Sequence, residues 1–449
     1  MASTQINYTQ GTPTNGIKYT LSMWVKRSNT DSGSNYLASV WVDGSNHWCM
    51  RFIGDQLDIY DNVSGSTTTE IKTNRKFKDC SAWYHIVYVY DSANATPGDR
   101  MKLYVNGVEE TSFATDTNPS SSYASILNVS GRVLTIGARN SASYWDGSMS
   151  HINFIDGTAC LPTVFGETDA TDGMWKIKTS PSVTYGNNGF FLKMEDSSNL
   201  DLDSSGNSHT FTTTGTLTAT KDNPSNNFTT MNPLLKSSYC TLSNGNTKTA
   251  GNSASDTGNC STTLLATTGL YYAEIKSGTI YGTTYPRVGV QHTPNTNYGR
   301  GINGTDGGAG GAGTPNGIEG YACANGQKFT SNVLSSFGSA WIATDILAVA
   351  MDCTNGAAYV AINNVWQNSG DPTSGASKTG ALVTWTPADV DATAFASCDY
   401  NGSFLEWNFG NGYFGSTAIG SPVSAGEGLW KYTPPTNYGA FCTKNINAA

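Results

Sequence analysis

Short segments in which apolar and polar residues alternate recur along the chain, separated by turns rich in glycine and asparagine. Segments with this pattern include residues 19–28, 36–41, 47–53, 56–60, 85–91 and 132–137. Alternation over about five to eight residues is typical of β-strands. No segment keeps its apolar residues on one helical face for roughly three turns, so the pattern predicts an all-β protein.

Residues 101–110 have the pattern of a β-hairpin, and a related stretch follows far downstream. The apolar positions alternate as far as Asn106-Gly107, two residue types that tolerate the positive φ of a tight two-residue turn. Residues 358–366 repeat the arrangement around Asn363-Asn364, and each copy follows a strand that ends in aspartate. The repetition predicts two related β domains in series.

Length and composition support this division. The 449 residues suit two or three domains of about 150 residues each, and two hairpin centres favour two. Only 13% of the residues are charged, against a usual share of roughly 25%, and good helix formers are sparse. Residues 196–233 lose the alternation and are rich in Asn, Thr and Pro. The predicted domains are therefore 1–195 and 234–449, joined by a connector at 196–233.

Charge and cysteine usage narrow the class of partner. The net charge is −9 and no stripe of Lys and Arg is present, so we expect no nucleic-acid partner. No apolar run approaches the roughly 18 residues of a membrane helix, so we expect no membrane insertion. Nine cysteines without a C-x-x-C pair favour reduced thiols in a protein folded in a cytoplasm, although one or two later disulfides stay open.

Four motifs in the first half occur in an order that resembles a known family. They are Ser-x-Trp-Val at 22–25, Trp-Tyr-His-Ile-x-x-x-Tyr at 83–90, Leu-Tyr-Val-Asn-Gly at 103–107, and aromatic-x-Gly-x-Met-x-x-Ile-x-Phe at 145–154. Together they resemble a laminin-G-like domain of the concanavalin A-like lectin/glucanase superfamily, over about residues 15–195. The resemblance implies an antiparallel jelly-roll sandwich.

The second half resembles a SPRY domain, itself a concanavalin A-like sandwich. The matching features are Tyr-Tyr-Ala-Glu-Ile at 271–275, the strand 345–352, the echo hairpin with Asp371-Pro372, Asn-Phe-Gly at 408–410 and Tyr-Thr-Pro-Pro at 432–435. Asn364 replaces the usual hairpin glycine, and the glycine-rich loop at 299–317 is longer than expected. The predicted fold class is thus two concanavalin A-like antiparallel β-sandwiches in tandem.

The order of these two domains is similar to virion-associated proteins of tailed bacteriophages. The resemblance implies a non-catalytic structural protein on the particle exterior, as a decoration, fibre or tail-associated adhesin. Its partners would be other virion proteins and host-surface carbohydrate, its location the virion assembled in the host cytoplasm, and its assembly a homo-oligomer, with a trimer as the working guess. The alternatives are a glycan-degrading tail enzyme and a free-standing lectin or SPRY module.

Aromatic side chains are the candidate glycan-binding groups, because a ring face stacks on a sugar while neighbouring amides bind its hydroxyls. The candidates that lie in or beside predicted loops are Trp41, Trp48, Tyr60, Tyr144 and Trp145. Core packing would explain about two thirds of such aromatics equally well, because alternation buries one face of each strand. The sequence alone does not show which face of each strand is exposed to solvent.

Other chemistry has weaker support. Five isolated histidines form no zinc motif, and we predict no resident metal or cofactor. Asp55, Asp58 and Asp61 are conceivable oxygen donors for Ca²⁺. A glycosidase needs two carboxylates about 5–9 Å apart, and the only similar spacing, at 167–172, has the composition of a polar loop. Gly308 to Gly313 satisfy G-x-G-x-x-G without a flanking strand and helix, so we interpret them as a loop. We expect no enzyme.

Overall fold

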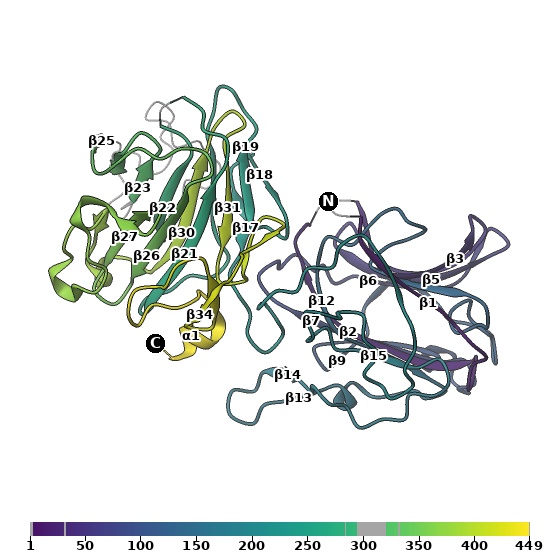
Figure 1. Ribbon diagram of the computed structural model, residues 1–449. Coiled ribbons are helices and arrows are strands. Elements are labelled where there is room, and N and C mark those ends of the chain that lie inside the picture. Colours follow the sequence, from purple (N-terminus) through teal and green to yellow (C-terminus); the bar gives the residue numbers. More distant parts are fainter. Residues whose placement is uncertain (1–2, 31–32, 283, 294–319, 331–332, 449) are drawn as a thin grey trace. The chain divides into compact units, whose positions relative to one another are not determined.

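The computed structural model describes residues 3–30, 33–282, 284–293, 320–330 and 333–448. The chain divides into two compact units, Met1–Ala219 and Thr220–Ala449, and each is built of antiparallel sheets (Figure 1). The described part of the chain contains no helix with the length and apolar character that crossing a membrane requires. The motif at Gly308 to Gly313 lies outside the described residues.

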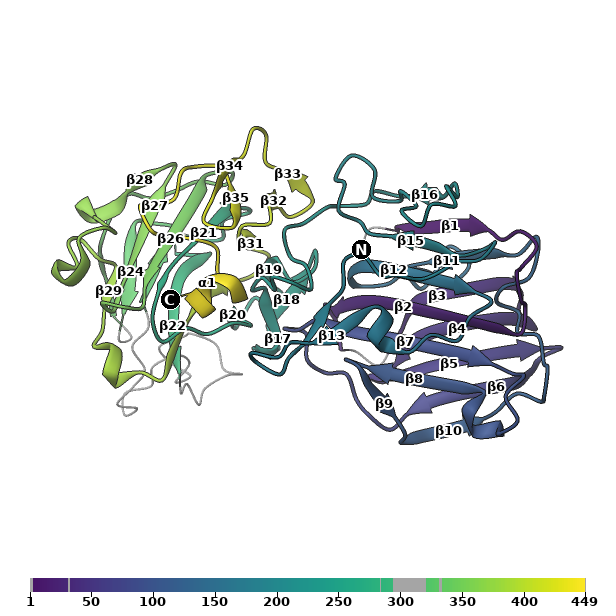
Figure 2. The ribbon, with the colours of Figure 1, turned by 90° about the horizontal axis from the view of Figure 1, so that it is seen from below.

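Where the structure describes it, the first unit consists of two sheets, a separate hairpin and two 3-10 turns. The bounds are β1 Gln5–Thr9, β2 Lys18–Arg27, β3 Ser34–Asp43, β4 Asn46–Ile53, β5 Gln56–Val63, β6 Ser66–Thr73, β7 Tyr84–Asp91, η1 Pro97–Asp99, β8 Met101–Val105, β9 Val108–Glu110, β10 Phe113–Thr117, β11 Val133–Ile136, β12 Gly147–Asp156, η2 Pro162–Val164, β13 Gly166–Thr168, β14 Trp175–Ile177, β15 Phe190–Leu192 and β16 Thr212–Thr214. The large sheet has the order β10-β6-β5-β4-β3-β11-β1-β16, the small sheet the order β15-β12-β2-β7-β8-β9, and β13 pairs with β14. Figure 2 shows these strands from below.

The main core of the first unit lies between its two sheets. Strand β2 buries Tyr19, Leu21, Met23 and Val25 there, the face that alternation selects. The opposite face of the small sheet is also covered, because the segment after β12 packs Phe165 and neighbouring side chains over it. The polar positions of β2 are therefore buried too, which a half-exposed strand would not show.

The predicted hairpin and its repeat have the same local structure. Asn106 and Gly107 have φ of +50° and +80°, and Val105 faces Val108 across the turn. In the second unit Asn363 and Asn364 have φ of +47° and +66°. Both pairs form two-residue turns in which each central residue has positive φ, as the Asn-Gly and Asn-Asn sequences predict.

The described residues of the second unit form two larger sheets, two small hairpins, three 3-10 turns and one short helix. The bounds are β17 Met231–Lys236, β18 Cys240–Ser243, β19 Lys248–Gly251, β20 Gly258–Thr262, β21 Leu270–Ser277, β22 Arg287–Thr293, β23 Gly320–Cys323, β24 Gln327–Thr330, β25 Val333–Ser336, β26 Ile346–Asp352, β27 Ala357–Ile362, β28 Val365–Trp366, η3 Gln367–Ser369, η4 Gly375–Ser377, β29 Val383–Thr384, η5 Pro387–Asp389, β30 Ala392–Asp399, β31 Phe404–Asn408, β32 Tyr413–Phe414, β33 Thr417–Ala418, β34 Val423–Ala425, β35 Gly428–Trp430 and α1 Thr443–Ala448. The sheet orders are β17-β20-β30-β22-β23-β24-β25 and β18-β19-β31-β21-β26-β27-β28, with β29 paired to β27. The main core of this unit draws side chains from both sheets.

The predicted connector at 196–233 is divided between the two units. Its first part belongs to the first unit, where β16 pairs with β1 and Phe211 packs against the core. Its last part belongs to the second unit, where Phe228 packs with Trp430 and β17 begins. The contacts place the boundary at Ala219 and Thr220. The sequence pattern does not reveal the edge strand β16, because the strand is only three residues long and consists of threonine.

Candidate functional site

The outer face of the large sheet in the first unit carries a set of planar side chains. We call it the arginine–aromatic row, and its members are Tyr36, Trp41, His47, Arg51, Tyr60 and Arg139. All but Arg139 come from β3, β4 and β5, which are adjacent in the sheet. Arg139 follows β11, the other neighbour of β3. The row therefore depends on sheet pairing, not on nearness in the chain.

A β-bulge explains why Tyr36 faces outward. The register of β3 against β4 shifts between Tyr36 and Ala38, and the next two residues, Leu37 and Ala38, both enter the main core. A bulge inserts one extra residue and re-aims the side chains beside it. Tyr36 instead packs with Cys49 and Tyr60 in a separate outer cluster.

The planar groups of the row stack on one another. The Trp41 and His47 rings lie 4.5 Å apart and nearly parallel. The Arg139 guanidinium carbon lies 4.9 Å from the ring centroids of both Tyr36 and Trp41. The Arg51 guanidinium lies 4.8 Å from the Tyr60 centroid. Contacts of this kind between guanidinium and aromatic groups are attractive and fix the orientation of the arginine.

Hydrogen bonds join the two arginines through one hydroxyl. Arg51 Nη1 and Arg139 Nη1 donate to the Tyr36 hydroxyl at 2.9 Å and 2.8 Å. A tyrosine hydroxyl oxygen can accept two such bonds. On its other edge, Arg51 donates from Nε to Asp58 Oδ2 at 2.9 Å, and its Nη2 lies 2.9 Å from the same oxygen. Both guanidinium groups are thereby held in place.

Asp58 and Glu70 form a carboxyl pair beside the row. Their side chains are hydrogen-bonded to each other, and Asp58 Oδ1 is buried with no other partner. Two carboxylates in direct contact cannot both ionise. Because Arg51 favours the charged form of Asp58, the contact between the two carboxyl groups acts mainly on Glu70. Burial, followed by the neighbouring Asp58 charge, raises the pKa of Glu70.

The two arginines give the row a positive field. Burial lowers the pKa of His47, and the charges of Arg139 and Arg51 lower it further. The imidazole is therefore neutral at pH 7, and its role in the row is stacking. Beside Arg139 the face continues as a polar strip, in which Thr135 Oγ1 donates to Asn7 Oδ1 at 2.9 Å.

The structure brings together two of the five predicted aromatic residues and separates the others. Trp41 and Tyr60 belong to the row, where both ring systems contact His47. Trp48 was wrongly placed among the surface groups, since it is 1% exposed in the main core. It faces the opposite side of β4 from His47, as alternation requires.

Tyr144 and Trp145 lie in the segment that leads from Arg139 to β12. Trp145 packs against the main core with its ring 5.8 Å from Phe52, and its Nε1 is buried. The residue is partly exposed, and its ring lies against the core rather than in the row. Tyr144 is partly exposed and its hydroxyl donates to the Ser141 carbonyl at 2.7 Å.

The three aspartates considered for Ca²⁺ do not converge. Asp55 pairs with Arg27 at 3.1 Å, Asp58 pairs with Arg51, and Asp61 points into the core, where it accepts a hydrogen bond from the Ile126 amide. Ca²⁺ needs six or more oxygens around one point. Among the residues that the structure describes, no group of three acidic, histidine or cysteine side chains could hold a metal ion.

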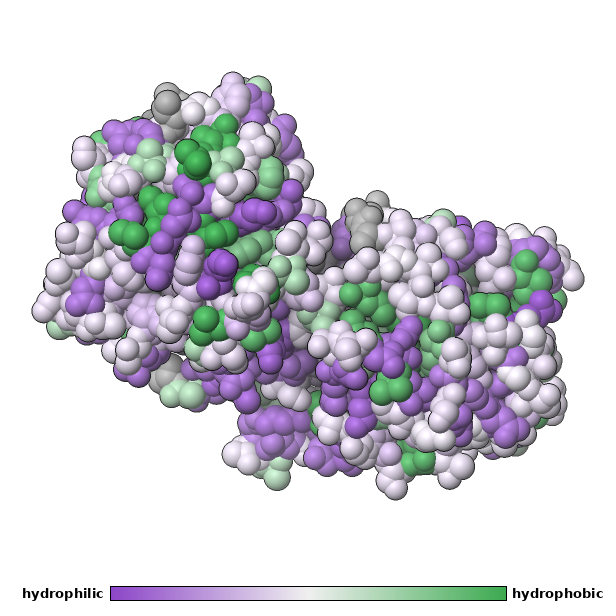
Figure 3. Space-filling model, in the orientation of Figure 1, coloured by the Kyte–Doolittle hydropathy of each residue, from purple (hydrophilic) through white to green (hydrophobic). Residues whose placement is uncertain are grey.

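The acidic stretch at 167–172 begins in β13 and continues into the loop of the β13–β14 hairpin, so most of it is the polar loop that its composition indicates. Glu167 lies in β13, and Lys176 of β14 reaches both Asp169 and Asp172, at 2.7 Å and 2.8 Å. The space-filling view shows hydrophilic residues gathered over the hairpin (Figure 3). These carboxylates lie at the surface and are paired with lysine, so they do not form the pair of facing carboxyl groups that a glycosidase needs on either side of its substrate.

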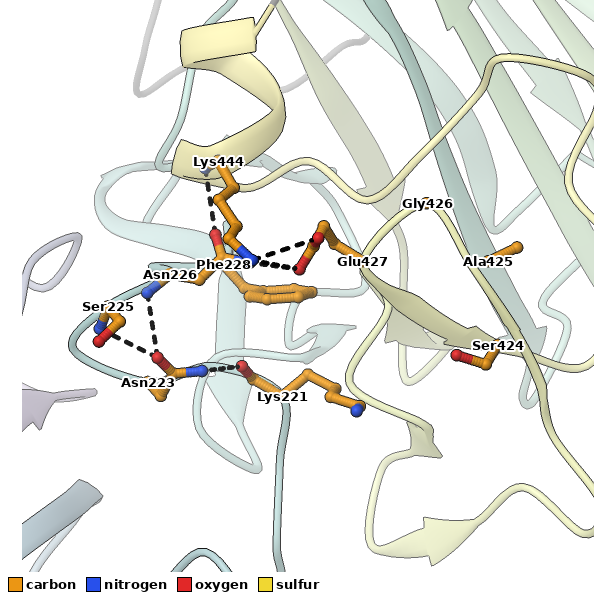
Figure 4. A pocket seen from close by; sticks show the side chains of 10 residues that line it. All are labelled: Lys221, Asn223, Ser225, Asn226, Phe228, Ser424, Ala425, Gly426, Glu427 and Lys444. Carbon is orange, nitrogen blue, oxygen red and sulfur yellow. Dashed lines mark hydrogen bonds and ion pairs between the residues drawn. The ribbon is translucent and has the colours of Figure 1, made fainter. Parts of the chain in front are cut away.

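A depression of about 510 Å³ lies in the second unit, between the start of that unit, the β34–β35 turn and α1 (Figure 4). Its charged groups are satisfied in part, because Lys444 Nζ lies 3.3 Å from the Glu427 carboxylate. Phe228 lines it but is 2% exposed, so no ring face is available for stacking. The depression is therefore a weaker candidate site than the arginine–aromatic row.

Sequence reasoning missed most of the row. Arg51 and Asp58 face each other across the β4–β5 pair. This pairing could have been predicted by counting residues outward in both directions from the two-residue turn at Gly54-Asp55. The pairing of β11 with β3 brings Arg139 to Tyr36, and the sequence carries no local signal for that long-range contact. The sequence likewise carries no local signal for the β-bulge at Tyr36.

The first part of the chain matches a family model described as the concanavalin A-like lectin/glucanases superfamily, over residues 2–159. Among solved structures, the chain is similar to a native heptameric SAP-like pentraxin from Limulus polyphemus, with 19% identity, 35% of this chain and 71% of that chain covered, and a TM-score of 0.26. It is also similar to the SPRY domain of human HERC1, with 14% identity, coverage of 39% and 96%, and a TM-score of 0.29. No curated protein matches. The all-β, concanavalin A-like fold class predicted from the sequence is confirmed.

Proposed function

We propose that the chain is a non-catalytic glycan-binding module and that the arginine–aromatic row is its binding site. The observation that carries the proposal is a set of oriented guanidinium, hydroxyl and indole groups on a rigid sheet face, in the part of the chain that matches the lectin/glucanase model. A few polar groups fixed beside aromatic surface are the usual elements of a sugar site. Trp41 and Arg139 are partly exposed and supply the accessible edges.

The row differs from the stacking site that the sequence analysis expects. The Trp41 ring already stacks on His47 and carries the Arg139 guanidinium. Sugar recognition would therefore use the polar edges of the row and the adjoining Asn7 and Thr135, with the aromatic rings acting mainly to hold the arginines.

Two contacts favour binding without catalysis. A glycosidase keeps its carboxyl groups about 5–9 Å apart, with substrate or water between them. Asp58 and Glu70 touch each other directly, and Asp58 is committed to Arg51. This pair leaves no room for a glycosidic bond.

A glycan array probed with the full chain tests the proposal. We expect signals that Trp41→Ala abolishes and that Tyr281→Ala, which alters an exposed aromatic of the second unit, leaves unchanged. An array without any signal, or signals insensitive to Trp41→Ala, would contradict glycan binding at this face. Release of reducing ends from a host polysaccharide, lost in Asp58→Asn or Glu70→Gln, would instead support the glycan-degrading enzyme.

The proposed setting is the exterior of a tailed-bacteriophage particle, with the module as a decoration, fibre or tail-associated component. This part rests on the resemblance of the domain order alone, an argument by analogy. Mass spectrometry of purified virions should find the chain, and light scattering should give the mass of a homotrimer. Absence from the particles would favour a free-standing lectin or SPRY module.

A further inference from the structure

Arg51 and Arg139 lie on the two sides of Tyr36 and make the same contact with it. Each donates one Nη1 hydrogen bond to the Tyr36 hydroxyl, and each guanidinium lies against the Tyr36 ring, with centroid distances of 5.6 Å and 4.9 Å. The two arginines come from different strands, β4 and the end of β11. In both, the Nη1 contact leaves the edge formed by Nε and Nη2 for other partners.

That second edge is filled in one arginine and open in the other. Arg51 directs Nε and Nη2 at the Asp58 carboxylate. Among the described residues, Arg139 has no carboxylate partner, and its Nε and Nη2 make no hydrogen bond to the protein. A guanidinium edge of this kind matches paired oxyanion oxygens with two parallel hydrogen bonds.

We infer that the glycan bound by this face is acidic and that Arg139 holds its anionic group through Nε and Nη2, as Arg51 holds Asp58. The ligand class is a saccharide that bears a carboxylate or a sulfate. The inference rests on the proposed function and names the substrate class of the same site.

Charge complementarity selects an anion. Of the two guanidinium charges in the row, Asp58 compensates that of Arg51, and no carboxylate of the described residues pairs with that of Arg139. The unit charge of Arg139 therefore remains on a chain whose net charge is −9. Burial, and after it the charges of Arg139 and Arg51, lower the pKa of His47. A neutral sugar would leave this charge uncompensated, whereas a uronate or sulfate group would pair with it.

The test compares acidic saccharides with uncharged counterparts on the full chain by isothermal titration calorimetry. The probes are oligogalacturonate, oligoglucuronate and a sulfated galactan, each beside its methyl-esterified or desulfated form. We expect at least one acidic probe to bind tenfold or more tightly than its counterpart. Arg139→Gln should remove this preference, since losing a charged hydrogen-bond partner typically costs about ten- to a hundredfold in affinity.

Matched variants separate the site from general charge effects. Arg132→Gln removes the same charge at the other end of β11 and should keep the preference. Arg139→Lys keeps the positive charge but lacks the two parallel N–H donors of the guanidinium group, and it should weaken binding. This variant keeps the test valid if Arg139→Gln disturbs the packing against Tyr36 and Trp41. Which acidic probe binds separates carboxylate from sulfate.

Equal affinity for charged and uncharged probes, or a preference that survives in Arg139→Gln, would overturn the inference and leave glycan binding intact. Failure of the full chain to bind any probe or any array glycan would refute the proposed function itself.

Discussion

Gly107 lies beneath the indole of Trp175, so closely that a Cβ atom at position 107 would overlap the six-membered ring. Gly107 is the second turn residue of the β8–β9 hairpin, and Trp175 belongs to β14, in the hairpin that covers the outer face of the small sheet. The glycine therefore has two reasons to be there. It adopts positive φ, and it makes room for the ring.

Gly107→Ala should destabilise the first unit by more than a turn substitution alone. The left-handed conformation costs roughly 1–2 kcal/mol for a residue with a Cβ, and overpacking against Trp175 adds about 1–3 kcal/mol. Gly131→Ala is the matched control, because Gly131 has φ of +77° and open space around it. Urea denaturation measures both. In a Trp175→Ala background the two glycine substitutions should cost the same, and a persistent difference would reject steric overlap as its cause.

Asp61→Asn should make the first unit more stable at pH 8. Burial raises the pKa of Asp61 to about 7, above its unfolded value of about 3.9. The folded state therefore holds the proton more tightly, and stability falls as pH rises from about 4 to about 7, then levels off. The loss amounts to roughly 4 kcal/mol at most. Thermal unfolding of the variant should lack this decline.

A buried aspartate in the other unit provides the control for Asp61→Asn. Burial raises the pKa of Asp399 to about 8, so Asp399→Asn should act in the same direction between about pH 4 and pH 8, but on the unfolding of the second unit. If Asp61→Asn left the pH dependence of the first unit unchanged, Asp61 would not be the buried acid that controls it.

The sequence predicted what depends on neighbouring residues, and it failed where distant segments meet. Alternation located β2 and β7, and Asn106-Gly107 located the turn. The position of Trp175 over Gly107 depends on a segment that folds back across a sheet, which no local pattern records. The outer faces of β2 and β7 are buried by the same segment, although alternation alone is typical of a strand with one exposed face.

The candidate site shows the same division. Trp41 and Trp48 lie on the adjacent strands β3 and β4, yet one faces the row and the other the core. Register shifts in β3, one of them next to Trp41, change which residues face outward. Simple alternation along the strand therefore assigns the wrong face to some aromatic residues. The pairing of β3 with β4 determines which side chains face outward.

Glu274→Ala should loosen the C-terminal segment of the second unit. The carboxylate of this fully buried residue accepts hydrogen bonds from the backbone amides of Lys431 and Tyr432, each at 2.7 Å. Leaving these two partly buried amides without a protein acceptor should cost about 2–4 kcal/mol. Hydrogen exchange should accelerate at those two amides. Glu406→Ala removes a more exposed carboxylate paired with Lys248, and we expect it to cost less than about 1 kcal/mol.

His85 should stay neutral and keep its proton on Nε2 across the physiological pH range. Burial lowers the pKa of His85 to about 3. Trp175 Nε1 donates to His85 Nδ1 at 2.9 Å, so the Nε2–H of the neutral ring faces the Ser22 hydroxyl, also at 2.9 Å. Ser22 Oγ therefore accepts a hydrogen bond from the Nε2–H group of His85. A catalytic base would have to present an unprotonated nitrogen to the serine.

Nitrogen-15 NMR of the imidazole measures this tautomer directly. Trp175→Phe removes the donor and should free His85 to exchange between tautomers. Trp24→Phe is the matched control, since Trp24 stacks on His85 with a centroid distance of 4.7 Å and donates no hydrogen bond to it. Because the donor to Nδ1 directs the histidine away from base chemistry, the wild-type protein should also resist labelling of Ser22 by a fluorophosphonate. Labelling of Ser22 at pH 7 would contradict both the tautomer and the non-catalytic function.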